Sequence, residues 1–247
     1  MENQTVQEYF NSDVVVSHYE QAARLIGLWE SEEKIFVRLF KKEDSILELG
    51  CGAGRIAMGL YELGYKNILA TDFAKNMVKK ARYLAKVLNY AIPIRQCDAL
   101  VLEFEDSVFE GVIFGFNGLM QIPKKEQRAK AIEEMFRVLK PGGFAVFTSH
   151  LRSFNKHKRF WEKEKALWKK NKQNLALDDF GDRFEATDMG DLYIHVPDRN
   201  EIEKVVKSIG FKIEALVPRS VIANESPEVR EFSDECVFWV LRKPQVQ

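Results

Sequence analysis

The sequence is poor in cysteine, and neither sign of charge is in excess. Its 247 residues include three cysteines, Cys51, Cys97 and Cys236, which are too scattered for a disulfide framework and form no CxxC pair for zinc. We therefore expect reduced thiols, as in a cytoplasmic protein. Lys and Arg together number 37, as do Asp and Glu, so the net charge is zero. This balance argues against a globally basic nucleic-acid binder.

Long apolar runs and targeting signals are also missing. No uninterrupted apolar run approaches the roughly 18 residues that cross a bilayer, so we expect no membrane partner. The polar, acidic start MENQTVQEYFNSD is unlike a signal or transit peptide. A hydrophobic content of 46% beside 30% charged residues excludes a disordered chain. The length is short for two full domains, so we expect one.

Strand-like apolar runs alternate with helical patterns through the middle of the chain. The runs lie at 45–49, 67–71, 92–97, 109–116 and 144–148, and the helical patterns at 55–63, 74–88 and 124–139. Such alternation indicates βαβ units and a parallel sheet, which right-handed crossovers make doubly wound. We therefore predict an α/β fold with a doubly wound, mostly parallel sheet.

A glycine-rich turn, ELGCGAGR at residues 48–55, joins the first strand to its helix. Glycine lets a ligand approach the backbone, and open α/β sheets bind ligands beyond the carboxyl ends of their strands. The spacing departs from the dinucleotide fingerprint GxGxxG, because Arg55 stands where the third glycine belongs. Glu48, just before the turn, disfavours a pyrophosphate and favours a cationic ligand group.

Two more acidic residues end the next two strands. Asp72 follows Gly54 at close to the roughly 20-residue offset of a ribose-binding carboxylate. Asp98 ends the third strand, where a carboxylate can accept a hydrogen bond from an adenine amino group. One such acid alone is more often a helix cap than a ligand contact. Together with Glu48, however, an acid stands at three successive strand ends, which favours a ligand with a ribose and a positive charge.

Residues 45–149 resemble the class I S-adenosylmethionine-dependent methyltransferases. ELGCGAGR is similar to the first motif of that family, TDFAKNMVKKAR to its second, DAL to its acidic position after the third strand, and RVLKPGGFAVF to its entry into the fifth strand. Residues 198–242 resemble its closing helix and reversed hairpin. Ala74 departs from the usual Ser or Thr, which removes a helix cap.

This resemblance implies both an architecture and a cofactor. The fold would be Rossmann-like, with a mostly parallel seven-stranded sheet, an antiparallel last strand and a helical lid insertion. A single domain at 1–247 would divide into N-terminal helices (1–42), a cofactor-binding core (43–150), a substrate lid (151–196) and a C-terminal helix with hairpin strands (197–247). The cofactor would be S-adenosyl-L-methionine, and no metal is expected.

The resemblance also implies which residues contact the cofactor. The turn glycines would line its methionine and ribose portions, Asp72 would accept both ribose hydroxyls, and Phe73 and Met77 would border the adenine. The full expected set is Glu48, Gly50, Cys51, Gly52, Gly54, Arg55, Asp72, Phe73, Met77, Asp98, Ala99, Leu100, Phe116 and Asn117. Phe73 and Met77 are equally consistent with core positions at helical spacing, and Asn117 with a turn residue before glycine.

Methyl transfer is an in-line displacement, so alignment and exclusion of water are its main requirements. A general base is needed only where the acceptor must lose a proton. The candidate catalytic residues are His150 after the fifth strand, His195 in LYIHVP, and Tyr19 in an N-terminal helix that would fold over the cofactor. A lone histidine beside a strand is more often structural. The NPPY motif expected for methylation of exocyclic base amines is absent, and FNGLMQIP stands in its place.

Residues 151–196 break the alternating pattern and form the natural acceptor lid, because insertions around a site set substrate choice. Their aromatic residues favour an apolar cover and hence a small-molecule acceptor. Within them, residues 152–172 hold nine Lys or Arg against two Glu. This basic segment is consistent with a solvated amphipathic helix, with a contact to RNA phosphates, or with an anionic small substrate.

We predict a methyltransferase that moves a methyl group in-line from S-adenosylmethionine to an O, N or C nucleophile of a small molecule, as a monomer or homodimer. One alternative is a tRNA methyltransferase of the wobble-uridine type, which the C-terminal half loosely resembles. A second is a non-catalytic S-adenosylmethionine-binding protein. A nucleotide-dependent oxidoreductase is disfavoured by Arg55, which replaces the helix-packing glycine.

Overall fold

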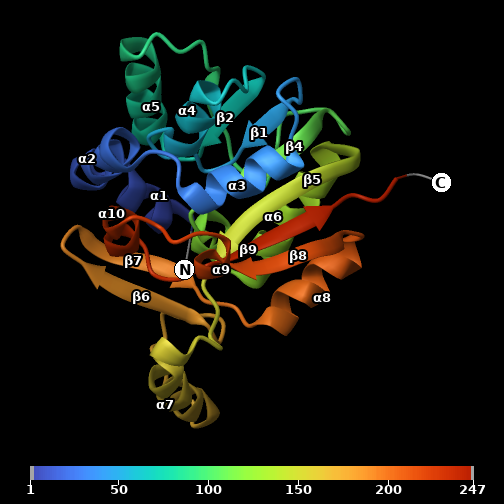
Figure 1. Ribbon diagram of the computed structural model, residues 1–247. Coiled ribbons are helices and arrows are strands. Elements are labelled where there is room, and N and C mark those ends of the chain that lie inside the picture. The colour runs from blue at the N-terminus through green and yellow to red at the C-terminus, as the bar shows by residue number, and fades with distance from the viewer. Residues whose placement is uncertain (1–2, 246–247) are drawn as a thin grey trace.

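A seven-stranded sheet in the order β3-β2-β1-β4-β5-β9-β8 forms the centre of the structure (Figure 1). The computed structural model describes residues 3–245 of the chain. The strands of this sheet are β1 (Ile46–Glu48), β2 (Ile68–Asp72), β3 (Ile94–Gln96), β4 (Phe109–Phe114), β5 (Leu139–Ser149), β8 (Lys212–Pro218) and β9 (Val237–Arg242). Strands β1 to β5 pair in parallel, and β9 runs antiparallel to both β5 and β8. The predicted Rossmann-like sheet with an antiparallel last strand is confirmed.

Helices cover both faces of the sheet, as the nearly continuous apolar strands require. The covering helices are α3 (Glu30–Leu39), α4 (Arg55–Glu62), α5 (Lys75–Val87), α6 (Lys125–Val138) and α8 (Arg199–Ile209). Ile46 and Ile113 share one core cluster with residues of α3, α4 and α5. Leu47 and Val112, one position away on the same strands, share the other cluster with residues of α6 and α8. Successive strand residues therefore face opposite helix layers, and the strand ends stay free to build a site.

The N-terminal segment lies across the carboxyl end of the sheet. It comprises α1 (Asn3–Asn11), α2 (Asp13–Gln21) and a π-helical turn at Ala22–Ile26. Asn11 accepts a hydrogen bond from the backbone N–H of Asn76 through its Oδ1 (2.8 Å), and its carbonyl accepts one from the Asn76 side chain (2.7 Å). Glu20 pairs with Lys80 at 2.6 Å. Helices α1 and α2 are thus fixed to α5, and Asn11 supplies the N-terminal cap that Ala74 cannot provide.

The segment at 151–196 contains more than the predicted helical lid. After a short 3-10 turn (Asn155–His157) comes α7 (Lys158–Lys169), which projects from the body of the molecule (Figure 1). The strands β6 (Asp182–Thr187) and β7 (Gly190–His195) then form a separate antiparallel hairpin. The helical description was incomplete because each hairpin strand is only six residues long and half of the residues of β6 are charged. Such short strands leave little alternation to detect.

Short elements also occupy the polar loop before the last strand. These are α9 (Arg219–Ile222) and α10 (Pro227–Phe232), and a 3-10 turn (Gly118–Gln121) follows β4. Within residues 3–245, none of the helices combines the length and apolar composition that crossing a bilayer requires.

Candidate active site

The turn after β1 depends on glycine at two positions. Gly50 and Gly52 have φ angles of +61° and +54°, in the left-handed region that favours glycine. A Cβ atom on Gly50 would lie 2.7 Å from the ring of Phe114. The Gly52 N–H donates a hydrogen bond to Asp72 Oδ2 at 2.7 Å. The turn therefore exposes backbone next to the carboxylate at the end of β2.

Gly54 has a different role from the one the sequence predicted. A Cβ atom there would lie 2.9 Å from Cε of Met58 and 3.4 Å from Cβ of Ala81, which belong to α4 and α5. The missing side chain lets these two helices pack together. Gly54 lines neither of the cavities described below, so its expected contact with a ligand is corrected to a helix-packing role.

Asp72 connects the glycine turn to the start of α5. Its Oδ2 accepts from Gly52 N–H and its Oδ1 from Ala74 N–H, both at 2.7 Å. Burial raises the pKa of this carboxyl group to about 6, although the two backbone N–H donors oppose the shift. A carboxylate has about four lone-pair sites. Each oxygen can therefore accept a further hydrogen bond, as from a ribose hydroxyl.

A cavity of about 120 Å³ opens beside this turn and carboxylate. Nine residues of the predicted cofactor set line it: Gly50, Gly52, Asp72, Phe73, Met77, Asp98, Ala99, Leu100 and Phe116. Gln7 and Phe10 of α1 also line it, and the sequence analysis did not identify them. Their helix carries no motif, so only its position across the sheet edge brings them here. We call this space the cofactor cavity.

Glu48 and Cys51 line a small recess of about 40 Å³ at the same turn, and Gly50 and Gly52 line both this recess and the cofactor cavity. The Glu48 side chain is buried, with 2% of its surface exposed, and its Oε2 has no hydrogen-bond partner among the described residues. Burial raises the pKa of this carboxyl group to about 8, against the influence of nearby Arg55. An unpartnered buried carboxyl oxygen fits a cationic ligand group such as an amine. The pKa of the buried Cys51 thiol is also raised by burial.

Arg55 lines the same recess, but its charge is already neutralised by the protein. Its guanidinium forms two hydrogen bonds with the Glu32 carboxylate, at 2.5 and 2.7 Å, and one with the Gly27 carbonyl at 2.9 Å. It also lies 4.6 Å from the ring centre of Trp29. Arg55 therefore attaches the N-terminal helices to α4, and the expected cofactor contact is corrected to a buried ion pair.

A second cavity, of about 260 Å³, adjoins the first, and we call it the acceptor cavity. The two cavities share a wall formed by Tyr19, Phe116 and Gln121. The β6–β7 hairpin and the loop before β9 close its other sides. Burial raises the pKa of the Tyr19 phenol well above its ordinary value. This group is therefore a neutral hydrogen-bonding group at the junction.

The backbone after β4 is strained at this junction. Phe116 and Asn117 have φ angles of +46° and +60°, which are uncommon for residues other than glycine and are costly for a bulky side chain. Phe116 is held by Phe232, with ring centres 4.9 Å apart, and by Trp29 at 5.5 Å. Asn117 lines the acceptor cavity and not the cofactor cavity, so its predicted cofactor contact is corrected.

His150 lines the acceptor cavity together with Asn117. Its Nδ1 lies 2.8 Å from the Glu235 carbonyl oxygen, and its Nε2 lies 3.1 Å from Asn117 Nδ2. A carbonyl only accepts, so we assign the proton to Nδ1 and the lone pair to Nε2. Burial lowers the pKa of this imidazole, which favours its neutral form.

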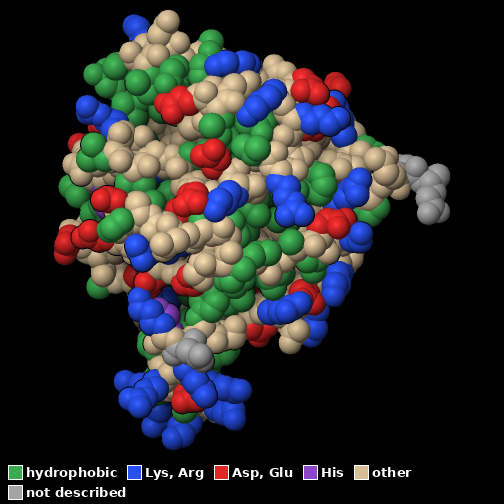
Figure 2. All heavy atoms as spheres, viewed as in Figure 1, with side chains coloured by type: hydrophobic (Ala, Val, Ile, Leu, Met, Phe, Trp, Pro, Cys, Tyr) green, Lys and Arg blue, Asp and Glu red, His purple; other side chains and the backbone are tan. Residues whose placement is uncertain are grey.

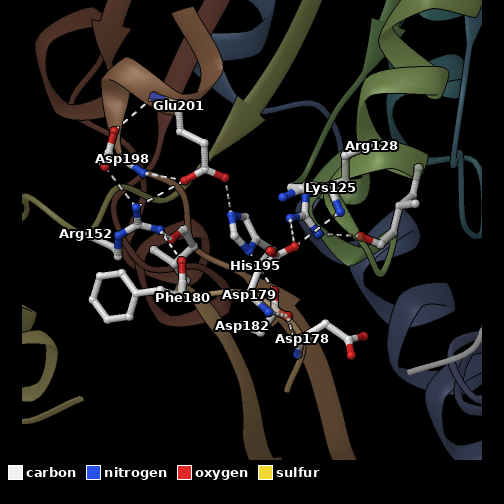
Figure 3. A network of polar contacts seen from close by, with 12 residues as sticks. Lys125, Arg128, Arg152, Asp178, Asp179, Phe180, Asp182, His195, Asp198 and Glu201 are labelled. Atoms are coloured by element: carbon white, nitrogen blue, oxygen red, sulfur yellow. Dashed lines mark hydrogen bonds and ion pairs between the residues drawn. The ribbon is translucent and has the colours of Figure 1, made fainter. Parts of the chain in front are cut away.

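His195 lies outside both cavities, in a buried polar network (Figure 3). Its Nδ1 is 2.7 Å from Asp182 and its Nε2 is 2.6 Å from Glu201, and 1% of its surface is exposed. Arg152 joins the network by pairing with Glu201 at 3.1 Å. Both ring nitrogens are occupied, so the predicted catalytic role is corrected: His195 joins the β6–β7 hairpin to α8.

Comparison with known proteins agrees with this geometry. Residues 46–143 match a family model described as a methyltransferase domain. Over these residues the chain resembles a methyltransferase domain of the class I S-adenosylmethionine-dependent kind. The family is one of enzymes, and S-adenosylmethionine is its cofactor. The residues present fit this cofactor, since the methyltransferase domain offers exposed backbone at Gly52, free acceptor sites on Asp72 and an unpartnered oxygen on Glu48.

Relatives in sequence cover only part of this chain. A demethylmenaquinone methyltransferase of Desulfitobacterium hafniense is 34% identical over 151 residues, which are 57% of this chain and 56% of that protein. One of Lactobacillus johnsonii is 34% identical over 137 residues, 52% and 54% of the two chains. The chain thus spans about half the length of these relatives.

Solved structures share the fold over most of this chain. A SAM-dependent methyltransferase of Methanosarcina mazei superposes with a TM-score of 0.69 at 18% identity, covering 86% of this chain and 98% of its own. The [4+2]-cyclase SpnF superposes with a TM-score of 0.60 at 16% identity, covering 92% and 81%. Since a protein named as a cyclase shares this fold, the fold does not identify the reaction by itself.

Proposed function

We propose that this protein transfers a methyl group from S-adenosylmethionine to a small molecule bound in the acceptor cavity. The observation that carries the proposal is the wall of Tyr19, Phe116 and Gln121 that the two cavities share. It puts an enclosed acceptor space directly against a space lined by the family's cofactor residues. The demethylmenaquinone methyltransferases among its relatives support a small-molecule acceptor.

The residues of the chain would bind and align the two reactants. Asp72 and the Gly52 backbone would hold the adenosyl ribose, and Glu48 would face the cationic amine. When bound, the cofactor supplies a methyl group attached to a positively charged sulfur. Tyr19 and Phe116 would exclude water from the junction and restrict the approach of the acceptor to one direction, which is the main catalytic contribution for an in-line transfer.

Calorimetry tests the cofactor half of this proposal. We expect the wild-type chain to bind S-adenosylmethionine and its demethylated product S-adenosylhomocysteine, and not NAD. Asp72→Asn should weaken binding of both at least about tenfold, or about 1.4 kcal/mol, because one oxygen becomes an amide donor. The matched control is Asp106→Asn, since Asp106 is exposed and pairs with Arg137 away from both cavities.

Mass spectrometry tests the acceptor half. A cell extract is incubated with the protein and methyl-labelled donor, then separated into small molecules and RNA. Label in the small-molecule fraction, absent with Asp72→Asn and present with Asp106→Asn, is the expected result. Binding of NAD alone, or cofactor binding without any labelled product, would contradict the proposal.

One observation favours RNA as a second candidate acceptor. Helix α7 projects from the molecule and carries a dense cluster of Lys and Arg, seen at the lower end of Figure 2. Its apolar side packs inward: Trp161 is buried, and its ring lies 5.9 Å from that of Phe180. Lys158, Lys163 and Lys169 are exposed, and among residues 3–245 no ion pair to them is observed. Such a surface suits a phosphate backbone.

A further inference from the structure

Part of the lining of the acceptor cavity is apolar and aromatic. The apolar residues come from the segment before α7, from α7 itself, from the hairpin and from α10: Phe154, Trp161, Leu192, Ile194 and Phe232. Side chains of this kind stabilise a flat, apolar ligand by burial and ring contacts. The cavity is therefore shaped for the carbon skeleton of an aromatic molecule.

The lysine and the arginine on the wall of this cavity are each paired with a carboxylate. Lys156 pairs with Asp234, and His157 Nε2 lies 3.5 Å from the same carboxylate. Arg183 pairs with Glu185 at 3.2 Å. The Glu235 carboxylate accepts from the backbone N–H of Ser220 at 3.1 Å. An anionic acceptor would thus find no unpaired positive charge on the lysine and arginine, and the Glu235 carboxylate, which only a neutral N–H among the described residues contacts, disfavours an anion further. Burying the charge of such an acceptor would be costly.

Hydrogen-bonding capacity remains at Asn117 and His150. Asn117 is 95% buried, and its Oδ1 has no partner among the described residues. His150 presents an Nε2 lone pair, which Asn117 Nδ2 occupies in this structure. A hydroxyl group complements this pair, because it can accept from Nδ2 while it donates to Nε2. Asn117 directly follows Phe116, so the pair stands next to the wall shared with the cofactor cavity.

We propose that the acceptor is a neutral aromatic molecule with a ring hydroxyl, which Asn117 holds and which gives its proton to His150 Nε2. This inference rests on the proposed function and specifies its substrate class. The acceptor oxygen forms a bond to the methyl carbon, and the carbon–sulfur electron pair goes to sulfur. The hydroxyl proton goes to Nε2, and the resulting imidazolium donates through Nδ1 to the Glu235 carbonyl.

The surroundings of His150 suit a base. Burial keeps its pKa below the ordinary value, so that the lone pair is available at neutral pH. The charged groups that act on it are the carboxylates of Glu185 and Asp234, which raise its pKa, and a protonated His157 would oppose them. The carboxylates would stabilise the imidazolium that forms on transfer.

Binding measurements on the chain saturated with S-adenosylhomocysteine test this class without any turnover. The probes are a naphthol, its methyl ether and the corresponding naphthoate, which share one ring system. We expect the naphthol to bind at least about tenfold more tightly than either the ether, which lacks the donor, or the naphthoate, which carries a charge. The imidazole ¹⁵N resonance of His150 Nε2 should move toward that of a protonated nitrogen when the naphthol binds.

Two variants test whether Asn117 and His150 contact the hydroxyl group of the acceptor. Asn117→Gly removes the amide at a φ of +60°, where glycine is unstrained, and His150→Gln removes the base. Each should lower naphthol affinity at least about fivefold with S-adenosylhomocysteine affinity unchanged. Asn89→Gly is the matched control, since Asn89 has a φ of +57° and lines neither cavity.

The possible failures are distinguishable. If the naphthol does not bind to the saturated chain, if the ether binds equally well or the naphthoate more tightly, or if neither variant weakens binding, this inference is wrong while the proposed function stands. If S-adenosylhomocysteine itself does not bind, the proposed function fails and the inference fails with it.

Discussion

Glu48 and Asp72 are buried acids on either side of one glycine turn, and their different hydrogen bonds give them different chemistry. Asp72 receives a backbone N–H on each oxygen, and its pKa rises only to about 6. Glu48 has one oxygen without a partner among the described residues, and its pKa rises to about 8. At neutral pH and without ligand, Asp72 is thus mainly ionised while Glu48 is mainly protonated.

The raised pKa of Glu48 predicts a pH-dependent stability. Between its unfolded value near 4.5 and its folded value of about 8, the native state binds more protons than the unfolded state, so the free energy of unfolding falls as pH rises through this window. The raised pKa of Asp72 also makes the free energy of unfolding fall as pH rises, and this contribution ends near pH 6. We expect Glu48→Gln to lose part of the decline measured by urea unfolding between about pH 5 and about pH 8.

The comparison is made without cofactor. Glu105→Gln serves as the control, because Glu105 is exposed on the surface, and it should retain the full decline. If the free energy of unfolding of Glu48→Gln fell with pH as steeply as that of the wild type, Glu48 would be ionised in the folded chain.

Site residues could be predicted where their position at the end of a predicted strand was enough to identify them. Gly50, Gly52, Asp72 and Asp98 stand at strand ends that the alternating pattern locates, and the structure places all four around the cofactor cavity. Arg55 also belongs to the motif, but its partner Glu32 lies in another helix, 23 residues earlier. No sequence pattern near Arg55 predicts such a partner.

His195 and Asn117 were assigned the wrong surroundings for a related reason. The partners of His195, Asp182 and Glu201, lie on a hairpin strand and on α8, and only tertiary packing brings them to the ring. Asn117 lies one residue beyond Phe116, which lines both cavities. The left-handed backbone at both positions turns the Asn117 side chain into the second cavity.

At the scale of elements, α1 and α2 are attached to α5 through polar contacts that side-chain changes can remove. Asn11→Ala deletes the cap on the Asn76 N–H, and we expect a loss of about 1 kcal/mol in the free energy of unfolding. We also expect faster hydrogen exchange at the Asn76 amide and faster dissociation of S-adenosylhomocysteine. Asn200→Ala is the control, since Asn200 is exposed on α8. Unchanged exchange at Asn76 would argue against the cap.

The contact between the hairpin and α8 predicts a purely structural effect. His195→Gln leaves buried Asp182 with one fewer hydrogen-bond donor and removes the contact with Glu201. We expect the free energy of unfolding, measured in urea, to fall by about 3 kcal/mol. Below the unfolding transition, S-adenosylhomocysteine affinity should match the wild type. Reduced cofactor affinity with unchanged stability would restore a role for His195 in the site.

Among the elements, those of the sheet and its covering helices were predictable to within a few residues, because buried strands and amphipathic helices have clear periods. Strand β5 begins at Leu139, earlier than the predicted 144, since the Pro-Gly-Gly sequence reads as a turn. The hairpin and the short helices α9 and α10 depend on contacts with the rest of the molecule, and their own sequences show little pattern.

At the scale of the whole molecule, α7 concentrates positive charge on a chain whose net charge is zero. If RNA binds there, the double variant Lys163→Glu/Lys169→Glu should lose the salt-dependent retention of tRNA on a filter, because phosphate contacts release counterions. Lys79→Glu/Lys86→Glu is the matched control, since both lysines are exposed on α5. Both double variants should bind S-adenosylhomocysteine as the wild type does.

Equal tRNA retention by the two double variants would exclude α7 as an RNA-binding surface and would leave it a solvated amphipathic helix. Weaker binding of a small anionic acceptor by the α7 variant alone would instead indicate that the helix attracts the substrate.

Tyr19 forms part of the wall of both cavities, and the helices that carry it are attached at two places. Asn11 contacts α5, and the Tyr9 hydroxyl lies 3.4 Å from Thr187 Oγ1 on β6. If the two cavities are filled as proposed, one segment would cover donor and acceptor together, and neither could exchange freely while that segment stays in place. Turnover would then follow a sequential kinetic scheme, with both substrates enclosed before either product departs.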